Sequence, residues 1–151
     1  MNIGDAVPHL TLEDAGGQQV SLANLAAPLV VYFYPKADTP GCTVEAKDFT
    51  QLGKDFASAG ITVVGISKDK VTKLAKFRDK YDLGVTLLSD EDGKACEAFG
   101  TWIQKKLYGR EYMGIDRATF LFDKDRKLAQ EWRKVKVKGH AVAVLEAAKA
   151  L

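Results

Sequence analysis

The segment Tyr34-Pro35-Lys36-Ala37-Asp38-Thr39-Pro40-Gly41-Cys42-Thr43-Val44-Glu45 joins an apolar run to an amphipathic one. Thr39 is a favourable N-cap residue, because its hydroxyl can accept a hydrogen bond from a free N–H of the first helical turn. Pro40 suits the first helical position, where its missing N–H costs nothing. The segment therefore predicts a helix that begins at Pro40 and carries Cys42 in its first turn.

Cys42 falls at the third position of this helix, where unpaired N–H groups and the helix dipole favour an anion. Cysteines in such surroundings can have pKa values of about 3.5–7.5 instead of about 8.5, and the thiolate is the nucleophilic form. Gly41 lets another group approach the backbone closely. Alternatively, Cys42 is a buried and inert small hydrophobe, as free cysteines frequently are. The local sequence leaves both interpretations open.

The residues around this segment predict an α/β fold. Residues 29–34 form a nearly continuous apolar run, which is typical of a buried central strand. Apolar positions recur at helical spacing after Cys42, and Gly60 predicts the end of that helix. Further elements follow from the same patterns: an N-terminal hairpin around 15–17, strands over 61–66, 85–88, 118–122 and 128–132, and helices over 71–81, 92–99 and 139–150. We therefore expect a mixed central sheet with helices on both faces. The first long strand-to-helix junction, a usual place for a site in such sheets, carries the thiol.

Size and charge narrow the class of protein. With 151 residues, we expect a single domain over residues 1–151. A net charge of +2 is too small to argue for nucleic acid or an anionic membrane as a partner. We expect the basic run 134–138 to be the solvated face of a strand or the approach to the last helix. No apolar stretch is long enough to span a bilayer, and the first five residues lack the features of a signal peptide. We therefore expect a cytoplasmic protein.

The chain has two cysteines, Cys42 and Cys96, and two histidines, His9 and His140. Two cysteines do not make a disulfide scaffold at this length. The wide spacing of these four residues also argues against a structural zinc site. We expect neither a metal nor a cofactor.

The pattern Pro35-x-x-x-Thr39-x-x-Cys42 resembles the active-site signature of the peroxiredoxins. The wider stretch 32–46 is similar to the subgroup called PrxQ or bacterioferritin comigratory protein. The similarity covers nearly the whole chain, with further matching segments at Gly4-Asp5, Pro8, Gly65-Ile66-Ser67, Leu87-Leu88-Ser89-Asp90, Phe99-Gly100-x-Trp102, Asp116-Arg117-x-Thr119-Phe120 and Lys136-Val137-Lys138-Gly139-His140. It implies a thioredoxin-like fold and reduction of hydrogen peroxide or organic hydroperoxides.

The resemblance also implies roles for four residues. Cys42 is expected to be the peroxidatic cysteine, whose thiolate attacks the peroxide and becomes a sulfenic acid. Thr39 is expected to hydrogen-bond the thiolate or the peroxide, and Pro35 to shield the site from bulk water. Arg117 is expected to hold the thiolate and to stabilise charge that develops on the O–O bond.

The chain departs from its subgroup at the second thiol. Many members carry a resolving cysteine five residues after the peroxidatic one, where this chain has Lys47. Cys96 lies on a helix face expected to be buried, and a disulfide requires Cα atoms within about 7 Å. We expect Cys96 to be a core residue, since a resolving role demands local unfolding. We therefore expect a one-cysteine cycle that an external thiol completes: thioredoxin, glutaredoxin or a small thiol.

Other interpretations remain at this point. A redox sensor or relay can use the same reactive cysteine with little turnover. A thioredoxin-like disulfide reductase is disfavoured, because Glu45 stands where a C-x-x-C motif needs its second cysteine. A cysteine–histidine hydrolase is disfavoured because we expect His140 to have a structural role at a helix start. Glu45 is either a solvated helix residue or an aid in orienting the active-site loop. We expect a monomer or a weak homodimer.

Overall fold

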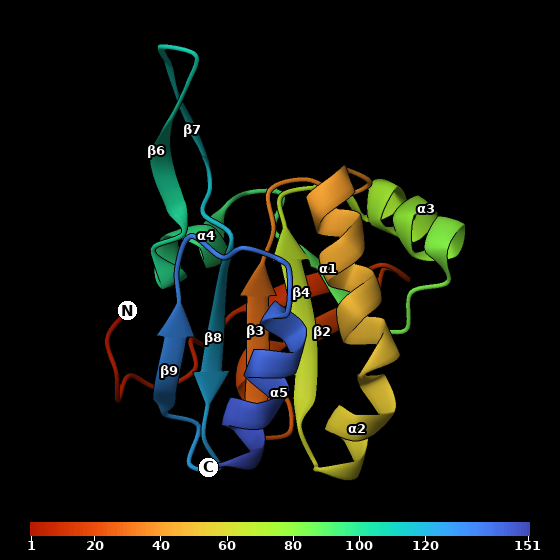
Figure 1. Ribbon diagram of the computed structural model, residues 1–151, viewed down its shortest axis with the longest axis vertical. Helices are drawn as coiled ribbons and strands as arrows, with labels where there is room; N and C mark the ends of the chain where they lie inside the picture. The colour runs from red at the N-terminus through yellow and green to blue at the C-terminus, as the bar shows by residue number, and fades with distance from the viewer.

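A seven-stranded mixed sheet forms the centre of the computed structural model, which describes residues 1–151 (Figure 1). Its order is β2-β1-β5-β4-β3-β8-β9, and the strands are β1 (Thr11–Asp14), β2 (Gln19–Ser21), β3 (Leu29–Phe33), β4 (Thr62–Ser67), β5 (Thr86–Ser89), β8 (Ala118–Phe122) and β9 (Leu128–Trp132). Strands β3, β4 and β5 run parallel, and the outer pairs are antiparallel. The mixed sheet predicted from the sequence is confirmed.

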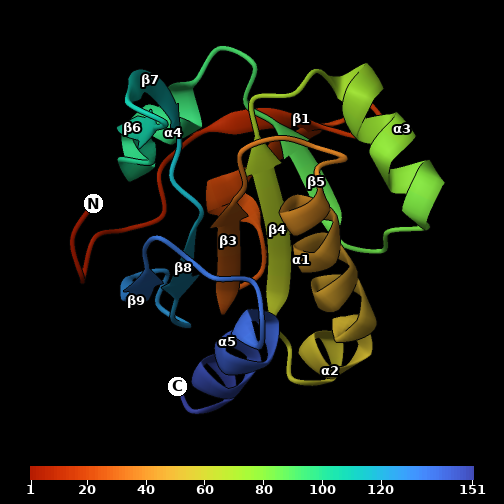
Figure 2. The ribbon, with the colours of Figure 1, turned by 45° about the horizontal axis from the view of Figure 1, so that its top comes forward.

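Helices cover both faces of this sheet (Figure 2). The core on one face contains residues of α1 (Pro40–Gln51), α2 (Gly53–Ser58), α3 (Val71–Tyr81) and α5 (His140–Lys149). The core on the other face contains residues of α4 (Lys94–Phe99) and of a short 3-10 turn, Leu22–Asn24. The expected two-faced arrangement is therefore confirmed.

The central strand β3 contributes to both cores and is buried along its whole length. Leu29, Val31 and Phe33 pack with α4, whereas Val30 and Tyr32 pack with α1. This alternation follows from the two-residue period of a strand. It explains why the run reads as continuously apolar, since neither side of the strand faces water.

Gly65 in β4 allows Tyr32 to lie against the sheet. A Cβ atom at position 65 would come within 2.5 Å of the Tyr32 ring. The ring stacks on Phe49 of α1 with centroids 4.5 Å apart. The glycine thus fixes how closely Tyr32, and with it α1, packs on the sheet beside Cys42.

Two elements differ from the expectations. The single helix predicted from Cys42 to Gly60 is two helices, because Leu52 leaves helical geometry at φ −87° and ψ 5°. A hairpin of β6 (Trp102–Leu107) and β7 (Arg110–Ile115) was not predicted, and it projects from the body at the end where α1 begins (Figure 1). The basic run 134–138 forms the loop that leads into α5. No helix is long and apolar enough to cross a membrane.

Candidate active site

Cys42 lies in the first turn of α1, as predicted. Thr39 has extended N-cap geometry, Pro40 is the first helical residue, and the loop before them leaves the sheet where β3 ends. The Cys42 side chain turns inward and is 1% exposed. A thiol at this place lies close to the free N–H groups of a helix start, which favour an anion.

Arg117 contacts Cys42 although the two residues are 75 positions apart in the sequence. It lies between β7 and β8, and its Nη2 donates a hydrogen bond to Cys42 Sγ at 3.3 Å. A Cβ atom at Gly41 would lie 3.2 Å from the same Nη2, so the glycine leaves room for the guanidinium. The expectation that another group approaches the backbone at Gly41 is confirmed, and the group is Arg117.

Glu45 is the second partner of Arg117. Its Oε1 accepts a hydrogen bond from Arg117 Nη1 at 2.7 Å, and the residue is 1% exposed. Of the two interpretations left open, the solvated helix residue is therefore wrong. Burial raises the pKa of the carboxyl to about 7, although Arg117 acts in the opposite direction. One guanidinium thus contacts both a thiol and a carboxyl that titrates near neutrality.

The side chains of Cys42 and Glu45 are almost fully buried, and that of Arg117 is 17% exposed. Tyr32 is fully buried, and neither its hydroxyl nor Glu45 Oε2 has a hydrogen-bond partner. Burial also raises the pKa of Tyr32 well above its ordinary value. Electrostatic interactions are stronger in such a low-dielectric region than in water. The contacts of Arg117 therefore have more effect here than at an exposed site.

Pro35 and Thr39 lie in the loop that precedes α1 and its thiol. Thr39 takes the N-cap position, but the capping hydrogen bond predicted for its hydroxyl is not formed. The hydroxyl instead turns back and donates to the carbonyl of Lys36 at 2.7 Å. Pro35 is partly buried, and no hydrogen bond joins Thr39 to Cys42. Both residues thus precede the thiol in the chain, and neither side chain makes a polar contact with it.

Residues beyond the predicted set hold this loop. The Ala37 N–H donates to Asp69 Oδ2 at 2.7 Å, and Ser67 donates to the same oxygen. Asp38, which has a left-handed φ of 61°, accepts hydrogen bonds from Tyr81 and Lys80 at the end of α3. The Tyr81 hydrogen bond, followed by that of Lys80, lowers the pKa of Asp38. Sequence spacing gave no signal for these contacts, because they join segments far apart in the chain.

Cys96 lies on the opposite face of the sheet from Cys42. It packs in the α4 core with Phe33, whereas Cys42 packs in the α1 core with Tyr32. It is 1% exposed, and its backbone N–H donates to Asp90 Oδ2 at 2.9 Å. Burial, with a smaller contribution from Asp90, raises the pKa of its thiol to about 12. The expected core position of Cys96 is confirmed.

His140 does not form a catalytic pair with Cys42. It is the first residue of α5, and its Nε2 lies 2.7 Å from Thr119 Oγ1. Its ring packs edge-on against Trp132 and Phe49. Burial lowers its pKa to about 4, so the ring is neutral near pH 7. These contacts agree with the structural role expected for it.

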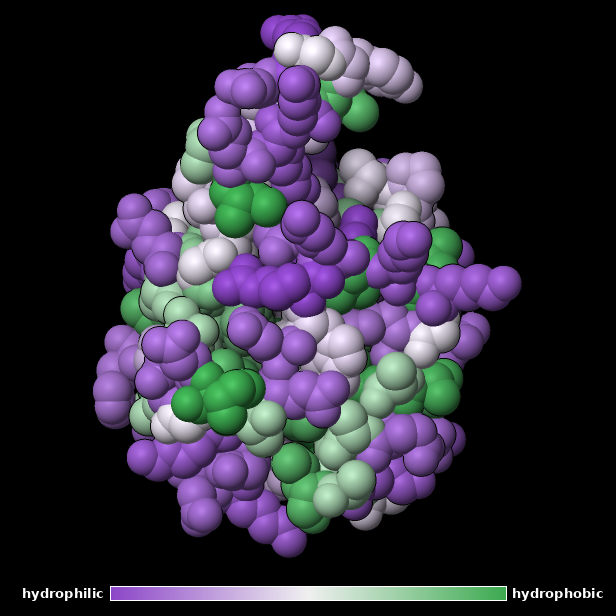
Figure 3. Space-filling model, turned by 60° about the vertical axis from the view of Figure 1, so that its left-hand side comes forward, coloured by the Kyte–Doolittle hydropathy of each residue, from purple (hydrophilic) through white to green (hydrophobic).

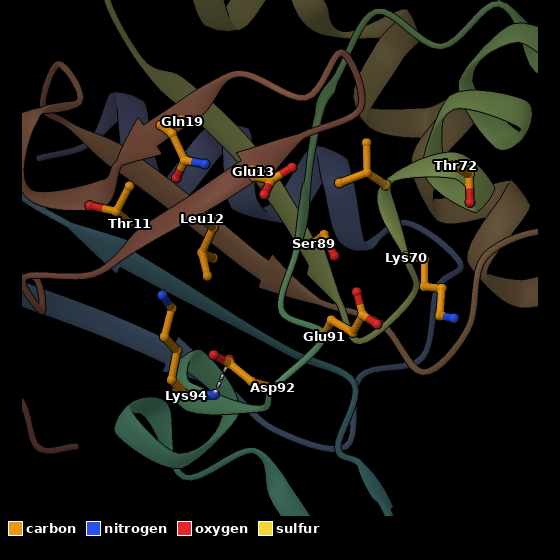
Figure 4. Close-up of a pocket in the computed structure, with 11 residues that line it drawn as sticks. Thr11, Leu12, Glu13, Gln19, Lys70, Thr72, Ser89, Glu91, Asp92 and Lys94 are labelled. Carbon is orange, nitrogen blue, oxygen red and sulfur yellow. Dashed lines mark hydrogen bonds between the residues drawn. The ribbon is translucent and has the colours of Figure 1, made fainter.

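A separate hollow of about 640 Å³ lies between β1, the end of β5 and the starts of α3 and α4 (Figure 4). Its lining includes Glu13, Glu91, Lys70 and Lys94, and it contains none of the residues around Cys42. No group of three or more histidine, cysteine or acidic side chains that could hold a metal ion occurs in the chain. The functional groups that meet at the candidate site are the Cys42 thiol, the Arg117 guanidinium and the Glu45 carboxyl.

Comparison with known proteins places this geometry in a family. The model of the AhpC/TSA family matches residues 3–131. The chain is 45% identical to peroxiredoxin Bcp of Bacillus subtilis over 150 residues, covering 99% of this chain and 96% of the relative. It is 44% identical to peroxiredoxin Bcp of Escherichia coli over 146 residues, covering 96% and 94%. A solved structure of the Xanthomonas campestris bacterioferritin comigratory protein, from work on its alkyl peroxide reduction activity, has a TM-score of 0.90 and 43% identity, covering 97% and 98%.

Proposed function

The chain belongs to the AhpC/TSA family and to its Bcp or PrxQ peroxiredoxins, which have a thioredoxin-like fold, and from this membership we propose that Cys42 is its peroxidatic cysteine. Peroxiredoxins are thiol peroxidases, so the enzyme reduces a hydroperoxide at the expense of a thiol. The observation that carries the assignment is the 3.3 Å hydrogen bond from Arg117 to Cys42 Sγ at a helix start. The related Xanthomonas campestris protein has alkyl peroxide reduction activity, and we include alkyl hydroperoxides with hydrogen peroxide among the substrates.

The chemical step is a displacement at oxygen. The Cys42 thiolate attacks one peroxide oxygen, the S–O bond forms, and the O–O bond breaks with its electron pair leaving on the second oxygen. That oxygen takes up a proton and departs as water or an alcohol, while Cys42 becomes a sulfenic acid. Arg117 donors aimed at the sulfur also lie where negative charge moves during this displacement, which lowers the barrier.

Three neighbours support Arg117 and Cys42. Glu45 fixes the guanidinium through its Oε1, so that Nη2 remains directed at the sulfur. Pro35 closes the site to bulk water. The Thr39 hydroxyl now donates to Lys36, and rotation about its Cα–Cβ bond frees it to donate to a bound peroxide.

The enzyme uses a one-cysteine cycle in this proposal. Two observations support it: the sheet separates Cys96 from Cys42, and a pKa of about 12 leaves the Cys96 thiol protonated. Lys47, at the position where many relatives have a second thiol, lies over the Tyr81 ring with its Nζ 4.8 Å from the centroid. An external thiol such as thioredoxin, glutaredoxin or a small thiol then reduces the sulfenic acid.

Steady-state consumption of a hydroperoxide with dithiothreitol tests this proposal. Cys42→Ser is expected to abolish turnover, because hydroxyl oxygen is not ionised near neutral pH. Cys96→Ser is the matched control and is expected to retain most of the activity. Full activity in Cys42→Ser contradicts the assignment of the nucleophile. A single turnover without recycling in the unmodified protein favours the sensor or relay instead.

A further inference from the structure

The β6–β7 hairpin is the main exposed apolar feature of the molecule outside its core. Leu107, Tyr108, Tyr112 and Met113 are all about half exposed or more, and Tyr108 at the tip is 95% exposed. The two strands pair only with each other and project from the body (Figure 1). Exposed apolar side chains gathered on one element are typical of an interaction site.

Positive charge accompanies these side chains. The hairpin carries Lys105, Lys106 and Arg110 against one acid, Glu111. The nearby loop 134–138 adds three lysines and no acid, although the whole chain has a net charge of only +2. In the space-filling view, the hairpin stands above the body as a largely hydrophilic projection with hydrophobic side chains within it (Figure 3). The surface is thus apolar in part and basic overall.

Both segments border the Cys42 site. Strand β7 ends at Ile115, two residues before Arg117. In the basic loop, the Val135 N–H donates to the Arg117 carbonyl at 2.9 Å. Burial lowers the pKa of Lys105, the negative charge of Asp116 opposes this shift, and the positive charge of Arg117 adds to it. The hairpin and the loop therefore reach the residue that contacts Cys42 Sγ.

We propose that the β6–β7 hairpin and the loop 134–138 form the docking surface for a dithiol protein whose reactive cysteine lies within an acidic surface. Opposite charge on the partner complements this basic rim and accelerates encounter. The exposed tyrosines and Leu107 supply the apolar contacts that hold the complex. The inference rests on the proposed function, because a peroxiredoxin needs a thiol to recover its oxidised cysteine.

The docked reaction transfers two electrons in two exchanges. A partner thiol attacks the sulfur of the Cys42 sulfenic acid, forming a mixed disulfide and releasing water. The second partner thiol then attacks the partner's own sulfur in that disulfide, which yields the oxidised partner and the free Cys42 thiol. A small-molecule dithiol such as dithiothreitol performs the same exchanges without docking to the hairpin.

A charge-reversal experiment separates the two kinds of reductant. The probe is a thioredoxin with an acidic surface around its dithiol, kept reduced by its reductase and NADPH. In the double variant Lys106→Glu/Arg110→Glu, we expect thioredoxin-supported turnover at limiting thioredoxin to fall about tenfold or more. Turnover with dithiothreitol stays unchanged. Raising the salt concentration slows the unmodified enzyme with thioredoxin and affects the double variant much less.

The matched control is Lys54→Glu/Lys124→Glu, which makes the same change in net charge on α2 and on the β8–β9 turn. It is expected to keep both activities. If the hairpin variant retains its thioredoxin rate, or the control loses as much, the docking surface is wrong while the peroxidase assignment stands. If thioredoxin supports no turnover but dithiothreitol does, the docking proposal also fails. If dithiothreitol supports none either, both proposals fail.

Discussion

Arg117 contacts a thiol and a carboxyl with one planar group. Its Nη1 and Nη2 donate to Glu45 and Cys42 respectively, which the fixed fork of donors in a guanidinium permits. A lysine at this place carries the same charge but has a single ammonium on a flexible stem. The Cys42 sulfur therefore interacts with a donor whose direction is fixed by the guanidinium geometry, as well as with a positive charge.

Arg117→Ala is expected to slow the reaction of Cys42 with peroxide by about 10²–10³-fold, a typical loss for a donor to a transition state. The rate of Arg117→Lys is expected to lie between those of the unmodified protein and Arg117→Ala, because lysine retains the charge but not both contacts. Stopped-flow measurement of the rate at which hydrogen peroxide oxidises Cys42 checks this. A rate constant that is unchanged in Arg117→Ala argues against the role.

Glu45 makes the stability of the protein depend on pH. Its folded pKa of about 7 lies above the ordinary value of 4.5, so the folded state holds a proton that the unfolded state releases. Its contribution to stability is therefore present below about pH 4.5 and is lost as the pH rises through 7. Glu45→Gln has no such proton. Its free energy of unfolding relative to the unmodified protein is expected to increase from pH 5 to pH 8 by up to about 3 kcal/mol.

Urea unfolding of both proteins at the two pH values measures this difference. Asp55→Asn on α2, at an exposed position, is the matched control and is expected to show little change between them. A difference for Glu45→Gln that is constant with pH contradicts the raised pKa.

Among the helices and strands, the sequence predicted those features that depend on neighbouring residues alone. The start of α1 follows from Thr39-Pro40, and the strands follow from apolar runs flanked by turn residues. The break at Leu52 was not predictable, because apolar residues continue at helical spacing across it. Likewise, the Thr39 hydroxyl could either accept a hydrogen bond from an N–H of the first helical turn or donate one to the loop. In the structure it donates to the carbonyl of Lys36.

The β6–β7 hairpin was missed for a different reason. Its strands mix apolar residues with lysine, glutamine, arginine and glutamate, and only Ile115, at the end of β7, is part of a core. Sequence patterns predict strands through burial on one face, so a hairpin that is solvated on both faces gives little signal. Tyr108-Gly109, both with positive φ, form the turn. Exposed apolar side chains on such a hairpin add little to the stability of the fold, and they indicate a surface that binds a partner.

At the scale of the whole molecule, one sheet separates two cysteines with different environments. Cys42 lies beside a guanidinium at a helix start, and Cys96 lies in an aromatic core with Phe99 and Phe120 nearby. Both cores share strand β3, and we propose on this basis that residues 1–151 act as a single domain. The resemblance to the family predicted Cys42 and Arg117 as site residues and exposed the missing second thiol, and the structure brings Cys42 and Arg117 into contact. The sequence could not place Glu45 or Asp69, whose contacts exist only after the sheet brings distant segments together.

The fate of oxidised Cys42 distinguishes the proposed one-cysteine cycle from its alternatives. The protein is treated with one equivalent of hydrogen peroxide without reductant, trapped with a reagent for sulfenic acids, and measured by intact mass and peptide mapping. We expect one trapped sulfenic acid, located at Cys42, with Cys96 still a free thiol and no intramolecular disulfide. A Cys42–Cys96 disulfide contradicts the one-cysteine cycle, and oxidation at Cys96 with Cys42 unmodified contradicts the assignment of the active site itself.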